Sequence, residues 1–371
     1  MSIPTEAIGS IPRSERLMAL QRQFDAGQLD PGRMEAAYEE AVLETLHELE
    51  ATGSTLISDG EQRKTHSFAS YSVDGGANFA LDGVAIPFAD GHVRHLPRLT
   101  QGPFRFNNYA FLGLEKAIKN TQMPMKQAII SASAISLFYP PEGLPLYSRD
   151  QFIADLLDEQ EKEIRGCFAA GAQRVQIDFT EGRLSIKLDM TGGILQSFIE
   201  LNNLVLSRFS VEDRQRIGVH TCPGADHDST HSADVDYAEL LPSLIEIQAG
   251  NFYIAMACEP DPVRALKIVA RYLKPTQRAF IGVIDVNSPH VETPEEVCER
   301  VMQAAAYIPL SQLGTTDDCG FSPFCDDMST LRETAFAKIR ARVLGTAMAA
   351  KSSDLPEFHF NASAPPVLST A

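Results

Sequence analysis

Several kinds of segment are missing from this chain of 371 residues, and each absence excludes a class of protein. No stretch of 18 continuous apolar residues occurs, so a membrane-spanning helix is not expected. The first residues lack a basic stretch followed by an apolar one, so no secretory signal is recognised. Six cysteines are too few over this length for a disulfide scaffold, which favours reduced thiols and a cytoplasmic location. The chain also has no tryptophan.

Positive charge is scarce as well. Lysine and arginine number 32 against 49 acidic residues, which gives a formal net charge of −17. Nucleic acids and anionic membranes select basic surfaces, so neither is an expected partner. A negatively charged substrate would need lysine or arginine close to its site. The hydrophobic content of 44% is that of a globular protein with a sizeable core, so small molecules are the expected partners.

Short apolar runs alternate with amphipathic stretches along most of the chain. The pattern predicts about eight strands, near residues 56, 100, 129, 176, 218, 254, 282 and 311, mostly separated by helices. Eight such units over roughly 300 residues predict an α/β fold of the TIM (βα)8 barrel type. A Gly-x-Gly-x-x-Gly dinucleotide fingerprint is absent, which weakens the alternative of an open, doubly wound sheet.

Residues 65–110 interrupt this alternation. They are rich in glycine, phenylalanine and polar residues without a clear period, and Val84–His95 has the pattern of a hairpin. Long loops of this kind are commonly functional, so we expect an excursion or lid after the first strand. We predict one catalytic barrel domain over residues 1–351, with an N-terminal extension, and a flexible tail over 352–371.

A candidate metal site lies at the end of one predicted strand. His220 and Cys222 stand two residues apart and therefore point to the same side of that strand. Cys319 stands just past the end of another strand. An imidazole and thiolates together suit zinc. The alternative is a buried histidine beside an inert cysteine, but the third ligand, Cys319, in a matching position favours the metal.

Other chemically useful residues also follow predicted strands. Active sites of TIM barrels lie at the carboxyl ends of the strands. Those ends here carry acidic, soft or small groups, which would converge on one pocket: Asp59–Glu61, Ser131–Ser133, Asp178, Cys258, Glu259 and Asp285.

Several of these motifs carry a resemblance to a known family. The chain resembles the catalytic domain of cobalamin-independent methionine synthase over nearly its whole length, and the matching motifs are Ile8–Arg13, Asp59–Arg63, Gln176–Asp178, Val219–Cys222, Gly282–Asp285 and Asp318–Gly320. It looks closer still to epoxyalkane:coenzyme M transferase and its relatives, through the strings His220–Gly224, Ser229–Pro242 and Gly314–Asp326.

The resemblance implies a barrel that holds one zinc ion, which binds a substrate thiol and presents it to an alkyl donor. The family's ligands fall on His220, Cys222 and Cys319. Some members have a glutamate as a further ligand, and Glu259 is the matching residue here. Cys258 beside it is a rival, and the substrate itself is a third candidate for the fourth position.

The resemblance also implies residues that hold the thiol substrate. Methionine synthases bind the amino acid part of homocysteine through positions that correspond to Ser10, Glu61 and Asp178. Glu61 and Asp178 are therefore expected to serve in binding and in catalysis. Arg13 and Arg183 are further expected substrate-binding residues.

Three departures count against methionine synthesis. The synthases continue the Asp178 motif with Glu-Pro, and this chain has Phe179 and Thr180. They stack folate on a tryptophan, which this chain lacks. Some carry a catalytic histidine where Asn287 stands, so Asn287 is taken as the catalytic position.

These departures favour a zinc-dependent thiol alkyltransferase whose donor is an epoxide or another activated small molecule. The first alternative is methionine synthesis from a methyl-folate or a simpler donor. A zinc lyase or hydrolase, or a non-catalytic zinc- or thiol-binding barrel, is the second. The expected partners are a small-molecule thiol and an alkyl donor, and the sequence leaves a homo-oligomer open.

Overall fold

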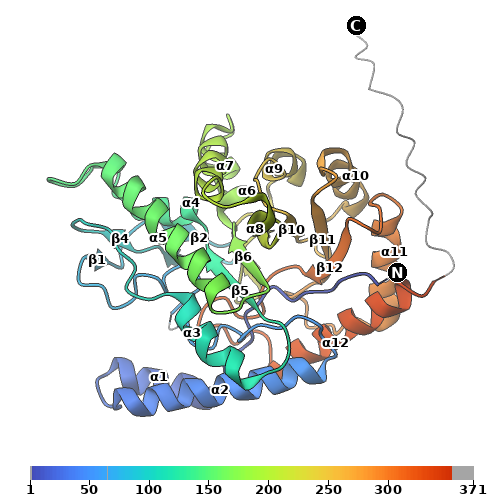
Figure 1. Ribbon diagram of the computed structural model, residues 1–371, viewed down its shortest axis with the longest axis horizontal. Helices are drawn as coiled ribbons and strands as arrows, with labels where there is room; N and C mark the ends of the chain where they lie inside the picture. The colour runs from blue at the N-terminus through green and yellow to red at the C-terminus, as the bar shows by residue number, and fades with distance from the viewer. Residues whose placement is uncertain (1, 65, 353–371) are drawn as a thin grey trace, which may run out of the picture.

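A parallel sheet of six strands forms the centre of the molecule. The computed structural model describes residues 2–64 and 66–352. The sheet has the strand order β12-β11-β10-β7-β6-β5 (Figure 1). Its members are β5 (Lys126–Ile130), β6 (Arg174–Asp178), β7 (Ile217–Thr221), β10 (Asn251–Ile254), β11 (Arg278–Ile284) and β12 (Leu313–Asp317). Nearly all of their residues are buried, as expected for strands covered on both faces.

Two short extended segments complete the ring of strands. Thr5 forms a parallel bridge with Thr315 of β12, and Ile57 forms one with Met125 at the start of β5. The two segments meet through the Ile11 amide, which donates to the Gly60 carbonyl at 3.0 Å. The predicted TIM barrel is therefore confirmed, and the predicted N-terminal extension supplies one of the eight strand positions in its wall.

Helices cover the outside of the barrel (Figure 1). Two capping boxes, at Ser148 and Thr293, fix the starts of α5 and α11, and proline occupies the first turn of α2, α10 and α11. The longer helices are α1 (Glu15–Asp25), α2 (Pro31–Ala51), α3 (Ala110–Ala117), α5 (Arg149–Ala169), α6 (Glu181–Leu188), α7 (Gly193–Leu206), α9 (Tyr237–Leu244), α10 (Pro262–Tyr272), α11 (Pro294–Ala305) and α12 (Arg332–Ala349). Shorter ones are α4 (Ala132–Ser136), α8 (Val211–Gln215) and a 3-10 turn at Ile118–Asn120.

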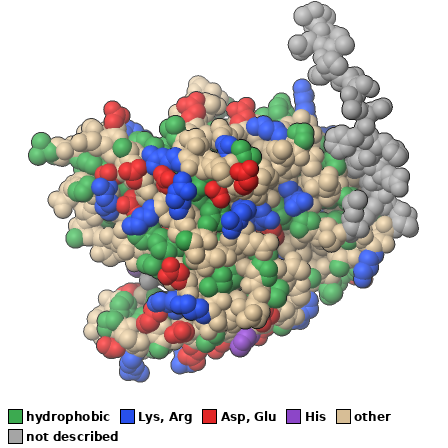
Figure 2. Space-filling view, in the orientation of Figure 1, with side chains coloured by type: hydrophobic (Ala, Val, Ile, Leu, Met, Phe, Trp, Pro, Cys, Tyr) green, Lys and Arg blue, Asp and Glu red, His purple; other side chains and the backbone are tan. Residues whose placement is uncertain are grey.

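None of the helices in the described part of the chain has the length and hydropathy needed to cross a membrane. On the face shown in Figure 2, acidic and basic side chains are interspersed, and no extended basic surface is seen there.

One predicted barrel strand was wrong. The run near residue 100 forms β4 (Arg98–Leu99), which pairs antiparallel with β1 (Phe79–Ala80) outside the central sheet. Pro97 and Pro103 bracket this run, and because proline has no N–H to donate, only a short pairing forms. The predicted hairpin is confirmed as β2 (Ala85–Pro87) and β3 (Val93–His95), and the predicted tail lies outside the described residues from 353 onward.

Residues 66–109, which we call the roof segment, pack against the barrel and are well anchored. The Leu99 amide donates to the Phe138 carbonyl at 2.8 Å. Phe104 packs edge-on against Phe152 of α5, with ring centroids 5.0 Å apart. The roof segment is thus an ordered cover over one end of the barrel.

A buried carboxyl group on α5 ties this helix to the roof segment. Glu163 accepts a hydrogen bond from the Tyr71 hydroxyl at 2.9 Å and one from the Ala110 amide at 2.8 Å, both through Oε1. Its Oε2 has no partner. Burial raises the pKa of Glu163 to about 7.

Glu163→Gln is expected to stabilise the protein at neutral pH. The raised pKa means that the folded state binds the Glu163 proton more tightly than the unfolded state, so stability is lost as pH rises from about 4.5 to about 7. The glutamine oxygen can keep both hydrogen bonds without this loss. Relative to wild type, the variant should gain on the order of 3 kcal/mol of unfolding free energy across that range.

Denaturant unfolding of both proteins at several pH values measures this gain. Glu161→Gln, on the same helix, is the control: Arg165 lowers the pKa of Glu161, so this variant should lose stability as pH rises. A difference between wild type and Glu163→Gln that does not change with pH would contradict the assignment.

Candidate active site

Three predicted metal ligands meet at the carboxyl end of the barrel. His220 lies in β7, Cys222 follows that strand, and Cys319 stands two residues after β12. Their ligand atoms all lie within 4.8 Å of one another, and all three residues are buried. The sulfurs of Cys222 and Cys319 are 3.3 Å apart. Period two along β7 explains why His220 and Cys222 share one side.

The donor chemistry of this group fits a zinc ion. Both ring nitrogens of His220 are buried without a hydrogen-bond partner, which is costly unless a ligand binds there. The hydrogen bond with Cys222, and then burial, raise the pKa of the Cys319 thiol, and a divalent cation would reverse that by binding the thiolate. One imidazole and two sulfurs leave a coordination position open, the pattern of catalytic zinc sites.

Glu259 does not join this group. Glu259 Oε2 forms an ion pair with the Arg183 guanidinium at 2.7 Å. The Glu259 carboxylate is not part of the cluster formed by His220, Cys222 and Cys319. Cys258 is also outside the group, and its amide donates to Asp318 at 2.8 Å. The Asp318 carboxylate also receives the amide of Met256 at 2.8 Å, which fixes the chain after β10. In this structure neither Glu259 nor Cys258 is thus part of the cluster formed by His220, Cys222 and Cys319.

A cavity of about 620 Å³ lies between the barrel end and the roof segment, and His220 and Cys319 are part of its wall. Three predicted substrate residues, Ser10, Glu61 and Asp178, line it as well. Its volume is in the range of small-molecule sites. His220, Cys222 and Cys319 are called the metal group from here on. The cavity thus brings this group and the residues expected to bind the thiol into one space.

Each of these three residues has a defined position. The Ser10 hydroxyl oxygen accepts a hydrogen bond from the Ser322 amide at 3.2 Å. A Cβ atom at Gly320 would lie only 2.0 Å from this oxygen, so glycine at the position after Cys319 lets the Ser10 side chain come close to the backbone. Glu61 has an ion pair with Lys64 at 3.2 Å, and burial raises the pKa of Glu61.

Asp178 ends β6, directly beside β7. Its Cα is paired in register with that of His220, which explains why the two residues line the same cavity. The Gln176 amide donates to Asp178 Oδ1 at 2.7 Å and fixes its orientation.

Three predicted site residues do not line the cavity. Arg13 is buried and donates to the carbonyls of Glu61 and Lys64, at 2.9 and 2.7 Å, so it supports the loop that carries Glu61. Arg183 lies 3.6 Å from the ring centroid of Tyr237 and pairs with Glu259. Asn287 is partly exposed, and only its backbone amide has a partner, at Asp285. Arg13, Arg183 and Asn287 are therefore not among the residues that line this cavity, and their roles in substrate binding or catalysis remain predictions.

One cavity residue was missed by the sequence analysis. Glu181, in the first turn of α6, lines the cavity and is 5% exposed. Its Oε1 accepts hydrogen bonds from Ser131, at 2.6 Å, and from Ser133. Burial raises the pKa of Glu181 to about 7. Its position three residues after Asp178, at the same strand end, was the signal that could have identified it.

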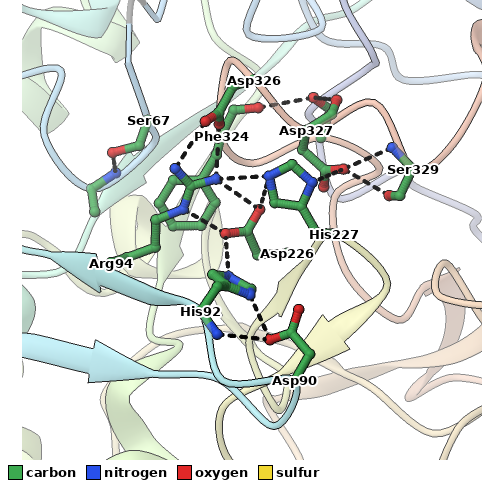
Figure 3. A network of polar contacts seen from close by, with 12 residues as sticks. Ser67, Asp90, His92, Arg94, Asp226, His227, Phe324, Asp326, Asp327 and Ser329 are labelled. Atoms are coloured by element: carbon green, nitrogen blue, oxygen red, sulfur yellow. Dashed lines mark hydrogen bonds and ion pairs between the residues drawn. The ribbon is translucent and has the colours of Figure 1, made fainter.

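A set of charged residues, which we call the roof latch, holds the roof segment over the cavity (Figure 3). Arg94 of β3 donates to both oxygens of Asp226, at 2.6 and 3.2 Å, and to both oxygens of Asp326, at 3.0 and 2.8 Å. Its guanidinium lies 4.3 Å from the ring centroid of Phe324. His92 reaches the same Asp226 at 2.9 Å.

The two aspartates of the latch belong to the loops that carry the metal group. Asp226 lies in β8 (Ala225–Asp226), which pairs with β9 (Ser229–Thr230) in the loop after Cys222. Asp326 lies in the loop after Cys319. A second set of metal-type ligands, Asp226, His227 and Asp327, occurs here, but Arg94 already supplies positive charge to Asp226.

Comparison with known proteins places the chain in a family. The sequence model of the family described as "Cobalamin-independent synthase, Catalytic domain" matches residues 126–332, and the chain belongs to this family. The class of protein defined by fold and family is thus a TIM-barrel transferase.

Particular relatives are methionine synthases. The chain is 23% identical to a methionine synthase from Sulfurisphaera tokodaii over 93% of this chain and 91% of the relative. It is 24% identical to one from Sulfolobus acidocaldarius over 86% and 85%. A longer relative, a 5-methyltetrahydropteroyltriglutamate--homocysteine methyltransferase from Nitratidesulfovibrio vulgaris, is 23% identical over 86% of this chain and only 39% of its own length.

Solved structures support the fold. A B12-independent methionine synthase from a Shewanella species, in complex with selenomethionine, aligns with a TM-score of 0.74 at 18% identity, over 95% of this chain and 98% of that one. A vitamin-B12-independent methionine synthase from Listeria monocytogenes, described as putative, aligns with a TM-score of 0.66 at 17% identity, over 94% and 99%.

Proposed function

We propose that this protein transfers a methyl or other small alkyl group to the sulfur of a small thiol, at a zinc site formed by His220, Cys222 and Cys319. The observation that carries the proposal is that this group shares one cavity with Glu61 and Asp178. Bound zinc keeps a coordinated thiol deprotonated at neutral pH and so supplies a nucleophile.

Homocysteine is the acceptor that the cavity supports best. Two carboxylates, Glu61 and Asp178, line the wall near the metal group and suit a substrate ammonium. The Ser10 segment, held beside Cys319, offers hydrogen-bonding groups at the same place. The relatives named as methionine synthases support this acceptor. The relatives described above give no support for an epoxide as the donor, so that part of the sequence-based expectation is not carried further.

The protein's own residues would bind and orient the acceptor. Glu61 and Asp178 hold its ammonium, and the hydrogen bond from Gln176 keeps Asp178 turned toward it. The roof segment lines the cavity and partly shields it from bulk water, which strengthens these charge interactions. The cytoplasmic location, single-domain organisation and use of zinc remain predictions of this proposal.

Titration of thiols into cobalt(II)-substituted protein tests the proposal. A thiolate that joins the metal group produces a sulfur-to-metal charge-transfer absorption, and homocysteine should do so at lower concentration than coenzyme M, glutathione or sulfide. Asp178→Asn should weaken homocysteine binding roughly tenfold or more, because it removes a charged hydrogen-bond partner. Asp150→Asn, an exposed carboxylate of α5, is the control. A spectrum that no thiol changes would refute the proposed function.

A further inference from the structure

The cavity wall has an unusual charge composition for the described residues. Arg94 is the only lysine or arginine among the residues that line it, and the lining carboxylates are Glu61, Asp74, Asp178, Glu181 and Asp326. Arg94 is already bound to Asp226 and Asp326 in the roof latch. An anionic second substrate would therefore find no free cation of this kind among the described lining residues.

Most of the lining carboxylates have a charged or amide partner. Glu61 pairs with Lys64, and Asp326 pairs with Arg94. Asp74 contacts the His66 ring at 3.0 Å, and Asp178 accepts from the Gln176 amide. Among the described lining carboxylates, Glu181 alone has side-chain partners that are hydroxyls only.

Glu181 has no compensating charge for a buried carboxylate. Its Oε2 is without a hydrogen-bond partner, while Ser131 and Ser133 both bind Oε1. Asn202 donates to the Ser133 oxygen at 2.6 Å and so fixes this arrangement. His231 also lines the cavity, but burial lowers its pKa to about 4, so it is neutral at physiological pH. A buried carboxylate of this kind is stabilised when a cation enters beside it.

Phenyl rings form much of the remaining wall. Phe68, Phe79, Phe88 and Phe324 line the cavity, together with apolar residues of the roof segment. The Phe324 ring already contacts the Arg94 guanidinium, which leaves Phe68, Phe79 and Phe88 for a ligand. A cavity lined by both aromatic rings and a carboxylate suits sulfonium and quaternary ammonium groups, whose charge is spread over methyl groups. Such groups cannot donate N–H or O–H hydrogen bonds, so they are held by aromatic rings and by the charge of a carboxylate.

We propose that the alkyl donor is an onium compound, in which the transferable group is bonded to a positively charged sulfur or nitrogen, and that Glu181 and the phenyl rings of the cavity bind its charge. The proposal rests on the proposed function and adds the class of donor. Glu181 follows β6, which is the neighbour of the strand that carries His220, so the onium group and the acceptor sulfur lie in the same cavity.

The chemistry balances without a further reactant. The acceptor thiolate forms a carbon–sulfur bond to the alkyl carbon, and the bond from that carbon to the charged sulfur or nitrogen breaks. The electron pair of the broken bond stays on the departing atom, which becomes a neutral thioether or amine. No proton has to be delivered to the leaving group. Opposite charges of thiolate and onium are cancelled in the products.

Calorimetric titration with two unreactive probes tests the proposal. The first is choline, and the second is its uncharged carbon analogue, in which a tert-butyl group replaces the trimethylammonium group. Wild-type protein loaded with zinc should bind choline roughly tenfold more tightly than the analogue. Glu181→Gln should reduce this preference to about twofold or less. Glu163→Gln, an equally buried carboxyl outside the cavity, should leave it unchanged.

Equal binding of the two probes to wild type, or no binding of choline, would overturn the proposal. A preference for choline that survives in Glu181→Gln would overturn the role of Glu181. Should that variant fail to fold, the wild-type comparison still decides, and Glu181→Asp, which keeps the charge, serves as the second variant. The titrations contain no thiol, so their outcome is independent of the cobalt experiment, whose failure would refute the thiol-transfer function instead.

Discussion

Cys319→Ser is expected to abolish stable metal binding and, with it, alkyl transfer. The substitution removes one of three ligands, whose sulfur lies 3.3 Å from that of Cys222. Loss of a residue that only supports a ligand typically costs 10- to 100-fold in metal affinity, so loss of a ligand should cost more than about 100-fold. Elemental analysis after dialysis should find about one zinc per wild-type chain and almost none in the variant.

Cys298→Ser is the matched control for this experiment. Cys298 is a partly exposed residue of α11 that does not belong to the metal group, so its variant should keep both zinc and activity. Thermal unfolding of both variants shows whether the fold is retained. Full zinc content in Cys319→Ser would mean that the group has been assigned incorrectly.

Arg94→Ala is expected to release the roof segment from the barrel. Asp226 is fully buried, and without Arg94 its carboxylate would keep only the imidazoles of His92, at 2.9 Å, and His227, at 3.7 Å, among its described ion-pair partners. Removing one partner of a buried ion pair costs about 3–5 kcal/mol. If this cost falls on local opening, amide hydrogen exchange in residues 79–97 should accelerate by roughly 100-fold or more. The Michaelis constants for the substrates should rise as well, since the roof segment lines the cavity.

Arg98→Ala on the same segment separates the latch from charge effects in general. Arg98 also forms a bidentate ion pair, with both oxygens of Asp82, but the Asp82 side chain is 65% exposed. Exposed ion pairs are screened by water and contribute little to stability, so exchange should change only slightly. Similar acceleration in both variants would contradict a special role for the latch.

The sequence predicted the metal group because the signal is local. Period two along β7 and the position of active sites at strand ends were enough to place His220, Cys222 and Cys319 together. The position of Glu259 outside this group could not be predicted, because it depends on a distant residue: Asp318 accepts the backbone amides of residues 256–258 after β10. Nothing in the local sequence shows that contact.

The TIM-barrel fold was predicted correctly, but one of its strands was assigned to the wrong segment of the chain. The segment around Thr5 has a single bridge to β12 and no periodic pattern, so sequence alone gave no reason to call it a strand. The run near residue 100 has the better strand pattern, yet it lies in the roof segment. The pattern of apolar and polar side chains indicates which residues are buried. A very short barrel strand is instead defined mainly by backbone pairing with a partner far away in the sequence, which this pattern does not show.

The pairing of Thr5 with Thr315 has a consequence for the order of events during synthesis. The segment around Thr5 leaves the ribosome long before its partner in β12, so the backbone groups that pair with β12 stay unpaired while the other barrel strands are made. The ring can close only when the last strand arrives, and this late contact between remote residues is a slow step by its nature. A ribosome-stalled chain that ends before residue 313 should therefore leave the segment around Thr5 open to protease.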